Sequence, residues 1–265
     1  MISSILPKLA VVALASLIAA APVAAQEKTL KVGVTAGPHA QIMEVVQQEA
    51  LKKGLKLEII EFSDYVQPNA ALAGGDLDVN SYQHQPYLDN ANADRGYGLV
   101  SIAKTVIYPI GIYSKKVKSL DELKSGARIG IPNDPTNGGR ALLLLQDKGL
   151  IKVDPKVGLK ATPIDVTENP KNLRFVELDA AQLGRSLDDT DASAINTNFA
   201  IEAKLDPAKD TIAKEAPESP YANVLVVQGK RRDEPVFKTL VESYHSPAVK
   251  AFIQQKYNNS VLTAW

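Results

Sequence analysis

The 265-residue chain contains no cysteine. Disulfide bonds, thiolate metal sites and cysteine nucleophiles are therefore excluded, and so is a lipid attached to a cysteine behind a signal peptide. Histidine is scarce as well, with three residues, so a zinc site is not expected and no cofactor is predicted. A chain without covalent cross-links depends on its hydrophobic core for stability, and this chain is long enough to build one.

The chain also lacks an excess of charge of either sign. Its 30 lysine and arginine residues are balanced by 30 aspartate and glutamate residues. Proteins that bind nucleic acid or anionic membrane surfaces generally carry a marked basic excess. Neither partner is expected here.

Long apolar runs are missing after the N-terminus. Residues 1–25 combine a single lysine, Lys8, an apolar run from Leu9 to Ala21, and small residues before Gln26. This layout predicts a secretory signal peptide cleaved before Gln26. A permanent N-terminal membrane helix is the alternative, although the run is shorter than the roughly 20 residues that span a bilayer. We expect an exported periplasmic protein that is not lipidated and has no stable membrane anchor.

Familiar catalytic motifs are absent too. The sequence has no GxSxG elbow, no P-loop and no dinucleotide-binding GxGxxG after a strand. Asp64, Asp76 and Asp78 lie in turn-like contexts, where capping is a more common role than acid–base catalysis. The sequence therefore favours a binding protein over an enzyme.

What is present is an alternation of strand-like and helix-like segments. In the first block, strands are expected at 30–34 and 57–62 and helices at 39–53 and from Ser63 to Gly75. In the second, we expect a short helix from Ser119, a strand at 128–131, a turn-rich loop at 132–139, a helix at 140–148 and a strand at 191–196. Such alternation predicts an α/β fold with mainly parallel sheets.

Two extended segments, 105–113 and 222–227, separate the blocks, and a helical region follows at 235–257 with a break near Ser246 and Pro247. We interpret this as two lobes joined by two crossover segments. Lobe I is predicted to comprise 26–115 and 221–265, and lobe II 116–220. One continuous doubly wound sheet is the alternative. In either case ligands are expected at the carboxyl ends of the strands.

Polar and aromatic side chains gather in the loops that follow the predicted strands. They are Gly37, Pro38, His39, Ser63, Asp64, Tyr65, Tyr82, His84, Tyr87, Asn133, Asn137, Arg140, Asn196, Asn198, Tyr221 and Asn223. Tyrosine rings can enclose an apolar group, an arginine can clasp a carboxylate bidentately beside helix N-terminal amides, and asparagines can bind an ammonium or a carboxylate. Taken singly, each of these residues is also common in loops, turns and ordinary packing.

Four segments together resemble one family. They are residues 33–40 (GVTAGPHA), 75–88 (GDLDVNSYQHQPYL), 131–142 (IPNDPTNGGRAL) and 194–200 (AINTNFA). The chain resembles the NlpA/MetQ family, the D/L-methionine-binding proteins of ABC importers, over essentially its whole length after the signal peptide. The resemblance implies a two-lobed type II periplasmic-binding-protein fold that closes on methionine, with an ABC permease and its ATPase as partners and a monomeric state.

The resemblance also implies roles for particular residues. Arg140 would hold the ligand carboxylate, and Asn198 and Asn223 would hold its ammonium and carboxylate. The rings that would enclose the ligand side chain are Tyr65, Tyr82, His84 and Tyr87, and Asn137 completes the predicted binding set. Asn196 is the alternative to Asn198.

One departure from the family pattern matters. Members are commonly lipoproteins anchored through a cysteine, which this chain lacks. Three alternatives stay open at this point: the same fold with another small apolar amino acid or a short Met- or Gly-containing peptide as ligand, an exported enzyme, and a surface adhesion module.

Overall fold

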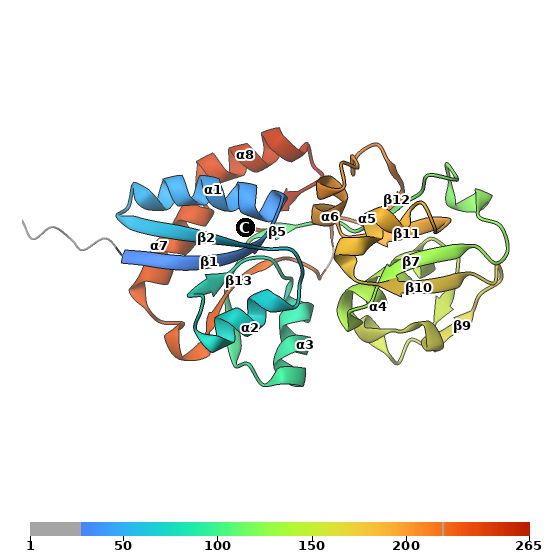
Figure 1. Cartoon of the computed structure of the whole chain (residues 1–265), viewed down its shortest axis with the longest axis horizontal. Coiled ribbons are helices and arrows are strands. Elements are labelled where there is room, and N and C mark those ends of the chain that lie inside the picture. The colour runs from blue at the N-terminus through green and yellow to red at the C-terminus, as the bar shows by residue number, and fades with distance from the viewer. Residues whose placement is uncertain (1–27, 219) are drawn as a thin grey trace, which may run out of the picture.

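The computed structural model describes residues 28–218 and 220–265. The predicted signal peptide and its cleavage junction lie outside the described residues. Within the described part of the chain, no helix is long and apolar enough to cross a membrane. Two five-stranded sheets lie side by side, each with helices on both faces (Figure 1).

The first sheet is built from both ends of the chain. In spatial order its strands are β2 (Leu55–Phe62), β1 (Lys28–Thr35), β3 (Val79–Asn80), β13 (Val224–Gln228) and β4 (Leu99–Lys104). The pairs of β1 with β2 and with β3 are parallel, whereas β13 runs antiparallel to β3 and to β4. Its helices are α1 (Pro38–Leu51), α2 (Gln67–Gly74), α3 (Gln85–Arg95), α7 (Pro235–Tyr244) and α8 (Pro247–Tyr257).

Both faces of this sheet are covered, as the side-chain alternation along β13 shows. Leu225 and Val227 pack into the cluster formed with α1, α7 and α8, while Val224 and Val226 pack with α2 and α3 on the other face. A strand buried on both faces reads as a continuous apolar run. The predicted break between the last two helices is confirmed, because the Ser246 side chain accepts a hydrogen bond from the Val249 amide and caps α8.

The second sheet comes from the middle of the chain. Its spatial order is β10 (Arg174–Leu178), β7 (Arg128–Pro132), β11 (Ala192–Ile195), β6 (Gly111–Tyr113) and β12 (Thr211–Lys214). One face packs on α4 (Pro135–Asp147), and the other on α5 (Leu183–Ser186) and α6 (Thr197–Glu202). Two small ladders complete the structure: β8 (Lys152–Val153) with β9 (Val166–Glu168), and β5 (Val106–Ile107) with β14 (Leu262–Thr263).

The chain crosses between the sheets twice, after β5 and after β12. β6 hydrogen-bonds with β11 and β12, so the strand that begins at Gly111 belongs to the second sheet. The predicted lobe boundary after residue 115 would place β6 in the first lobe. The pairing instead favours a boundary between Ile107 and Gly111.

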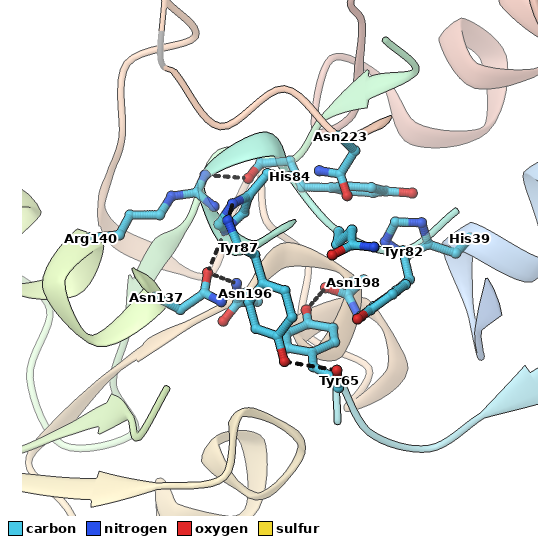
Figure 2. A pocket seen from close by; sticks show the side chains of 12 residues that line it. His39, Tyr65, Tyr82, His84, Tyr87, Asn137, Arg140, Asn196, Asn198 and Asn223 are labelled. Atoms are coloured by element: carbon cyan, nitrogen blue, oxygen red, sulfur yellow. Dashed lines mark hydrogen bonds between the residues drawn. The ribbon is translucent and has the colours of Figure 1, made fainter. Parts of the chain in front are cut away.

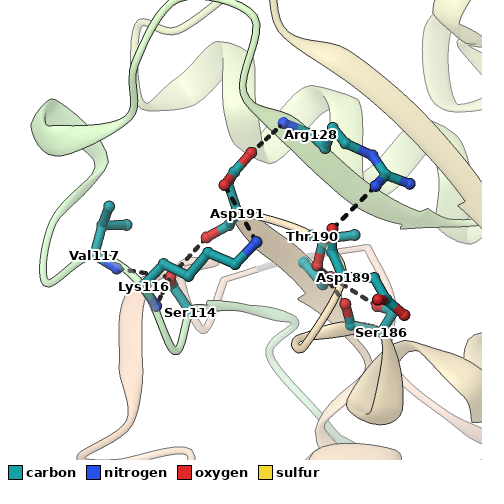
Figure 3. A network of polar contacts seen from close by, with 9 residues as sticks. Ser114, Lys116, Val117, Arg128, Ser186, Asp189, Thr190 and Asp191 are labelled. Carbon is teal, nitrogen blue, oxygen red and sulfur yellow. Dashed lines mark hydrogen bonds and ion pairs between the residues drawn. The ribbon is translucent and has the colours of Figure 1, made fainter.

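A cluster of polar side chains lies at the end of the second sheet where β7 begins (Figure 3). The Asp191 carboxylate accepts a hydrogen bond from the Arg128 amide at 2.7 Å and contacts Lys116 Nζ at 3.4 Å. The Ser114 hydroxyl donates to the Asp191 carbonyl oxygen at 2.6 Å. Hydrogen bonding from the Arg128 amide, the leading stabilising cause, lowers the pKa of Asp191. This cluster joins β7, β11 and the segment after β6.

The predicted loop at 132–139 is wrong in its second half, because α4 begins at Pro135 rather than at Arg140. Asp134 caps the helix by accepting from the amides of Thr136 and Asn137, and Pro135 suits the first helical position. Gly138 and Gly139 were taken for loop residues, but they serve close packing within the helix. A Cβ on Gly139 would overlap the Leu159 carbonyl oxygen and would lie 2.9 Å from the Ala161 nitrogen.

We therefore expect Gly139→Ala to destabilise the protein, although alanine is the better helix former. The added methyl group meets backbone atoms, which cannot rotate away, so the segment 159–161 must shift. The expected loss is on the order of 1–2 kcal/mol in the free energy of unfolding, measured by urea denaturation. Gly149→Ala serves for comparison, because its cost arises from a φ of 75° with no atom within 4 Å of the added Cβ. A Gly139→Ala variant as stable as the wild type would contradict the packing argument.

Candidate functional site

A pocket lies between the two sheets, at the carboxyl ends of several strands (Figure 2). Its lining residues are His39, Tyr65, Tyr82, Gln83, His84, Tyr87, Tyr108, Asn137, Arg140, Asn196, Asn198 and Asn223. The structure thus brings together all eight residues predicted from the sequence. His39 and Asn196, which were named among the loop residues, with Asn196 as the alternative to Asn198, also line the pocket, and Gln83 and Tyr108 are additional.

Three tyrosines form an aromatic wall on the side of the first sheet. The rings of Tyr65, Tyr82 and Tyr87 lie 6.0–6.2 Å apart, centre to centre, with tilted or edge-on orientations. The Tyr87 hydroxyl donates to the Tyr65 carbonyl oxygen at 2.8 Å. Phe199 from α6 approaches Tyr65 at 4.8 Å, so the wall also touches the second sheet's layer. Such rings offer polarizable apolar surface without charge.

His84 and Asn137 connect the two sides of the pocket. His84 caps α3, with Nδ1 accepting from the Tyr87 amide at 3.1 Å, and its Nε2 lies 3.2 Å from Asn137 Oδ1. Asn137 Nδ2 donates to the Asp134 carboxylate, so Asn137 Oδ1 must accept from His84 Nε2. These bonds assign a neutral His84 that carries its proton on Nε2. Asn137 Oδ1 accepts from Asn196 Nδ2 as well, at 2.8 Å, so its amide is fully occupied.

Burial keeps both pocket histidines neutral. Desolvation lowers the pKa of His39 to about 3, and desolvation together with the Arg140 charge lowers the pKa of His84 to about 3. Asp134, by contrast, has a pKa raised by desolvation, which outweighs the hydrogen bonds from Asn137 and Thr136. The pocket therefore gains no positive charge from histidine near neutral pH.

These shifts predict a loss of stability in acid. Between pH 6.5 and about 3 the unfolded chain binds protons on His39 and His84 that the folded protein does not bind. Stability therefore falls as the pH falls through this window, by about 1.4 kcal/mol per pH unit for each fully shifted histidine. In His84→Gln, the free energy of unfolding should change less steeply with pH between about pH 6 and pH 4. The slope should be smaller by up to about 1.4 kcal/mol per pH unit, the contribution of one proton, measured by urea denaturation at several pH values. An unchanged slope would mean that His84 protonates in the folded state.

Arg140 lies on α4, only 3% exposed, and points into the pocket. Its Nε donates to Glu215 Oε1 at 3.0 Å, and its Nη2 donates to the other Glu215 carboxylate oxygen and to the Tyr108 carbonyl oxygen, the latter at 2.8 Å. Tyr221 covers the guanidinium, with its ring centre 4.2 Å from Cζ. The bidentate side of the guanidinium is thus engaged with Glu215, and the expected bidentate clasp on a ligand is wrong for this arrangement. Within the described residues, Nη1 has no hydrogen-bond partner.

The helix amides expected to assist Arg140 are also engaged elsewhere. Because α4 begins five residues before Arg140, its first amides lie at Thr136 and Asn137, where Asp134 accepts from them. Positive potential at this helix end is therefore directed at Asp134. Any positive potential that Arg140 contributes to the pocket therefore comes from its own guanidinium.

Three asparagines present amide groups to the pocket. Asn198 Oδ1 accepts from the Tyr65 hydroxyl at 2.6 Å, and Asn196 Nδ2 donates to Asn137. Among the described residues, Asn198 Nδ2 and Asn196 Oδ1 are buried without a partner. Asn223, oriented so that its nitrogen donates to the carbonyl oxygens of Tyr82 and Gln83 at 3.2 Å each, presents Oδ1 as an acceptor. Buried amide groups left unpaired in a pocket indicate where a polar ligand binds.

Sequence reasoning missed Glu215 as part of this site. It follows β12, lies 75 residues from Arg140 in the sequence, and has a side chain only 14% exposed. No local motif marks it. Groups of three or more His, Cys, Asp or Glu side chains able to hold a metal ion are absent from the residues that the structure describes.

Two α/β lobes linked by two crossovers, with a polar and aromatic pocket between them, define the fold of the periplasmic binding proteins. The model of the NlpA lipoprotein family matches residues 30–265, and the chain belongs to that family. A D-methionine-binding lipoprotein MetQ of Salmonella typhimurium is 50% identical over 239 residues, which cover 89% of this chain and 88% of the relative.

Solved structures agree with this assignment. A nutrient-binding protein from Burkholderia cenocepacia bound to methionine is 53% identical, with a TM-score of 0.88, covering 89% of this chain and all of that one. An ABC transporter periplasmic substrate-binding protein from Coxiella burnetii is 50% identical, with a TM-score of 0.86 and the same coverage.

The comparisons correct the expected localisation. The family and its curated relatives are named lipoproteins, which implies lipid-anchored proteins rather than freely diffusing ones. The expectation of a periplasmic protein that is not lipidated is therefore wrong. That expectation rested on the absence of cysteine from the sequence, and the lipoprotein names of the family and its relatives overturn it.

Proposed function

We propose that this protein is the substrate-binding component of an ABC importer, that it captures methionine between its two lobes, and that it catalyses no reaction. One observation carries the proposal: a buried arginine and two unpaired amide groups face a tyrosine wall across one small pocket. The relative from Burkholderia cenocepacia, whose structure contains methionine, shares 53% of its sequence with this chain.

The polar end of the pocket suits the two charges of an amino acid. Arg140 Nη1 and Asn198 Nδ2 are donors for the ligand carboxylate, while Asn196 Oδ1 and Asn223 Oδ1 are acceptors for its ammonium. A buried zwitterion is costly unless both of its charges are paired. Asn137, whose amide is fully occupied, acts by positioning Asn196 and His84.

The aromatic wall suits a thioether. Tyr65, Tyr82 and Tyr87, together with the His84 ring, present ring faces and edges around the opposite end of the pocket. Contact between a sulfur atom and a ring edge stabilises binding by roughly 0.3–1.5 kcal/mol. None of these four side chains is charged, so an apolar ligand group is not disfavoured.

We assign lobe I to 28–107 with 221–265 and lobe II to 111–214, with closure about the two crossovers. Two hydrogen bonds support a closed arrangement, Tyr65 to Asn198 and His84 to Asn137, since each joins residues of different lobes. A ligand that contacts both lobes stabilises closure, and the closed shape is the signal that a permease and its ATPase would recognise. A monomer suffices for this role.

Mass spectrometry of the protein purified under native conditions tests the proposal. We expect one methionine per chain, released on denaturation and absent from a matched sample that was unfolded, dialysed and refolded. Another amino acid or a short peptide in its place would redirect the proposal to that ligand. A protein that carries nothing and binds neither methionine enantiomer after refolding would refute it.

A further inference from the structure

Glu215 occupies an unusual place for a carboxylate beside a ligand pocket. It follows β12 in the second crossover, and its amide donates to the Ile110 carbonyl oxygen in the first crossover at 2.9 Å. Its carboxylate pairs with Arg140 through two guanidinium nitrogens. With a side chain 14% exposed, Glu215 is held against Arg140 and is only weakly screened by water.

This pairing decides the charge of the pocket. Among the described residues that line it, Arg140 is the only lysine or arginine, and Glu215 already neutralises its charge. The lining histidines add none, since burial lowers the pKa of both to about 3. Asp134 contributes negative potential. Burial is the main cause that raises the pKa of Tyr65, Tyr82 and Tyr87, and the charge of Asp134 raises it further. The side chains of the pocket therefore contribute no net positive charge near neutral pH.

We propose that Glu215 is a specificity-determining residue that restricts the pocket to ligands carrying an ammonium as well as a carboxylate. This inference rests on the proposed function. A carboxylate arriving alone would share Arg140 with Glu215 and leave one buried negative charge uncompensated. A zwitterion brings its own positive charge to the acceptors Asn196 and Asn223, so the closed pocket stays neutral.

The physical basis is the cost of burying an unpaired charge. Removing one partner of a buried ion pair leaves the other charge unpaired, and adding a second anion to the pair has the same effect. Either change costs far more free energy in a buried site than at the surface. Specificity of this kind arises because the competing ligand binds more weakly, not because the preferred ligand binds more tightly. Hydroxy-acid and oxo-acid counterparts of methionine, which have the same side chain and carboxylate but no ammonium, are the ligands that Glu215 would exclude.

Calorimetric titration of two ligands into refolded, ligand-free protein tests this role. The ligands are L-methionine and its hydroxy-acid analogue, and the variants are Glu215→Gln, Glu215→Asp and the control Glu177→Gln, which alters an exposed glutamate on β10. Glutamine keeps the shape but leaves the Arg140 charge uncompensated. The preference for methionine over the analogue should narrow at least tenfold in Glu215→Gln, mainly through tighter binding of the analogue. Glu215→Asp and Glu177→Gln should retain the wild-type preference.

The outcomes separate this inference from the proposed function. Equal weakening of both ligands in Glu215→Gln, with an unchanged ratio, would make Glu215 merely structural and overturn the inference while methionine binding stands. A wild-type protein that binds the hydroxy-acid analogue as tightly as methionine would overturn it as well. If the wild type binds neither ligand, the proposed function and the inference fail together.

Discussion

Replacing Arg140 with alanine should reduce methionine affinity by a factor of about 30 or more. The variant removes the one cationic side chain found in the pocket lining of the described chain, and it leaves the Glu215 carboxylate buried without its partner. Truncating one partner of a buried, hydrogen-bonded charge pair costs about 2–5 kcal/mol, and each 1.4 kcal/mol corresponds to a factor of ten. Isothermal titration calorimetry at several temperatures measures the loss.

A double variant separates the binding role of Arg140 from its effect on folding. Arg140→Ala combined with Glu215→Gln removes both charges, so no carboxylate is left unpaired and much of the stability should return. Methionine affinity should stay low in this variant, because the carboxylate still lacks its cation. Circular dichroism verifies the fold. Wild-type affinity in a folded Arg140→Ala protein would end the assignment of Arg140 to the ligand carboxylate.

Replacing Tyr87 with alanine should weaken methionine about 30- to 100-fold, since removing a large, partly buried ring costs about 2–3 kcal/mol. Tyr87 is half-buried, and its ring faces Tyr65, Tyr82 and His84 around the end of the pocket assigned to the thioether. Alanine and glycine, as ligands, do not reach this wall and should lose much less. Competition binding with the three amino acids measures the difference.

Two variants control for indirect effects. Tyr87→Phe keeps the ring and removes only the hydrogen bond to the Tyr65 carbonyl oxygen, so most of the affinity should remain. Tyr97→Ala removes a ring that packs against the apolar cluster beneath the first sheet and does not line the pocket, so it should not change the order of the ligands. If Tyr87→Ala weakens all three amino acids equally, Tyr87 is only part of the scaffold.

Much of the fold follows from local patterns. Strand β1 and helix α1 were predictable because apolar residues recur with strand and helix periods and a Gly-Pro pair separates the two elements. The start of α4 was not predicted, because two consecutive glycines suggest a loop. Glycine is needed at Gly139 because the backbone of residues 159–161 packs closely against the helix there. This is a tertiary contact, which the local sequence does not indicate.

The site was predictable wherever its residues follow strands. Tyr65 and His84 follow β2 and β3 of the first sheet, and parallel pairing brings these two loops to one edge of that sheet. Asn198 follows β11 of the second sheet, whose corresponding edge faces the same pocket. Glu215 was not predictable by this reasoning, since it is defined by its pairing with Arg140 across 75 residues rather than by a motif. The bidentate clasp expected for Arg140 failed for the same reason.

The most direct test of the account is a crystal structure of the refolded protein with methionine. We predict one methionine between the lobes, its carboxylate within hydrogen-bond distance of Arg140 Nη1 and Asn198 Nδ2, and its sulfur against Tyr65, Tyr82 and Tyr87. Arg140 should keep its contact with Glu215. A methionine bound elsewhere, or one turned so that its side chain meets Arg140, would contradict the account.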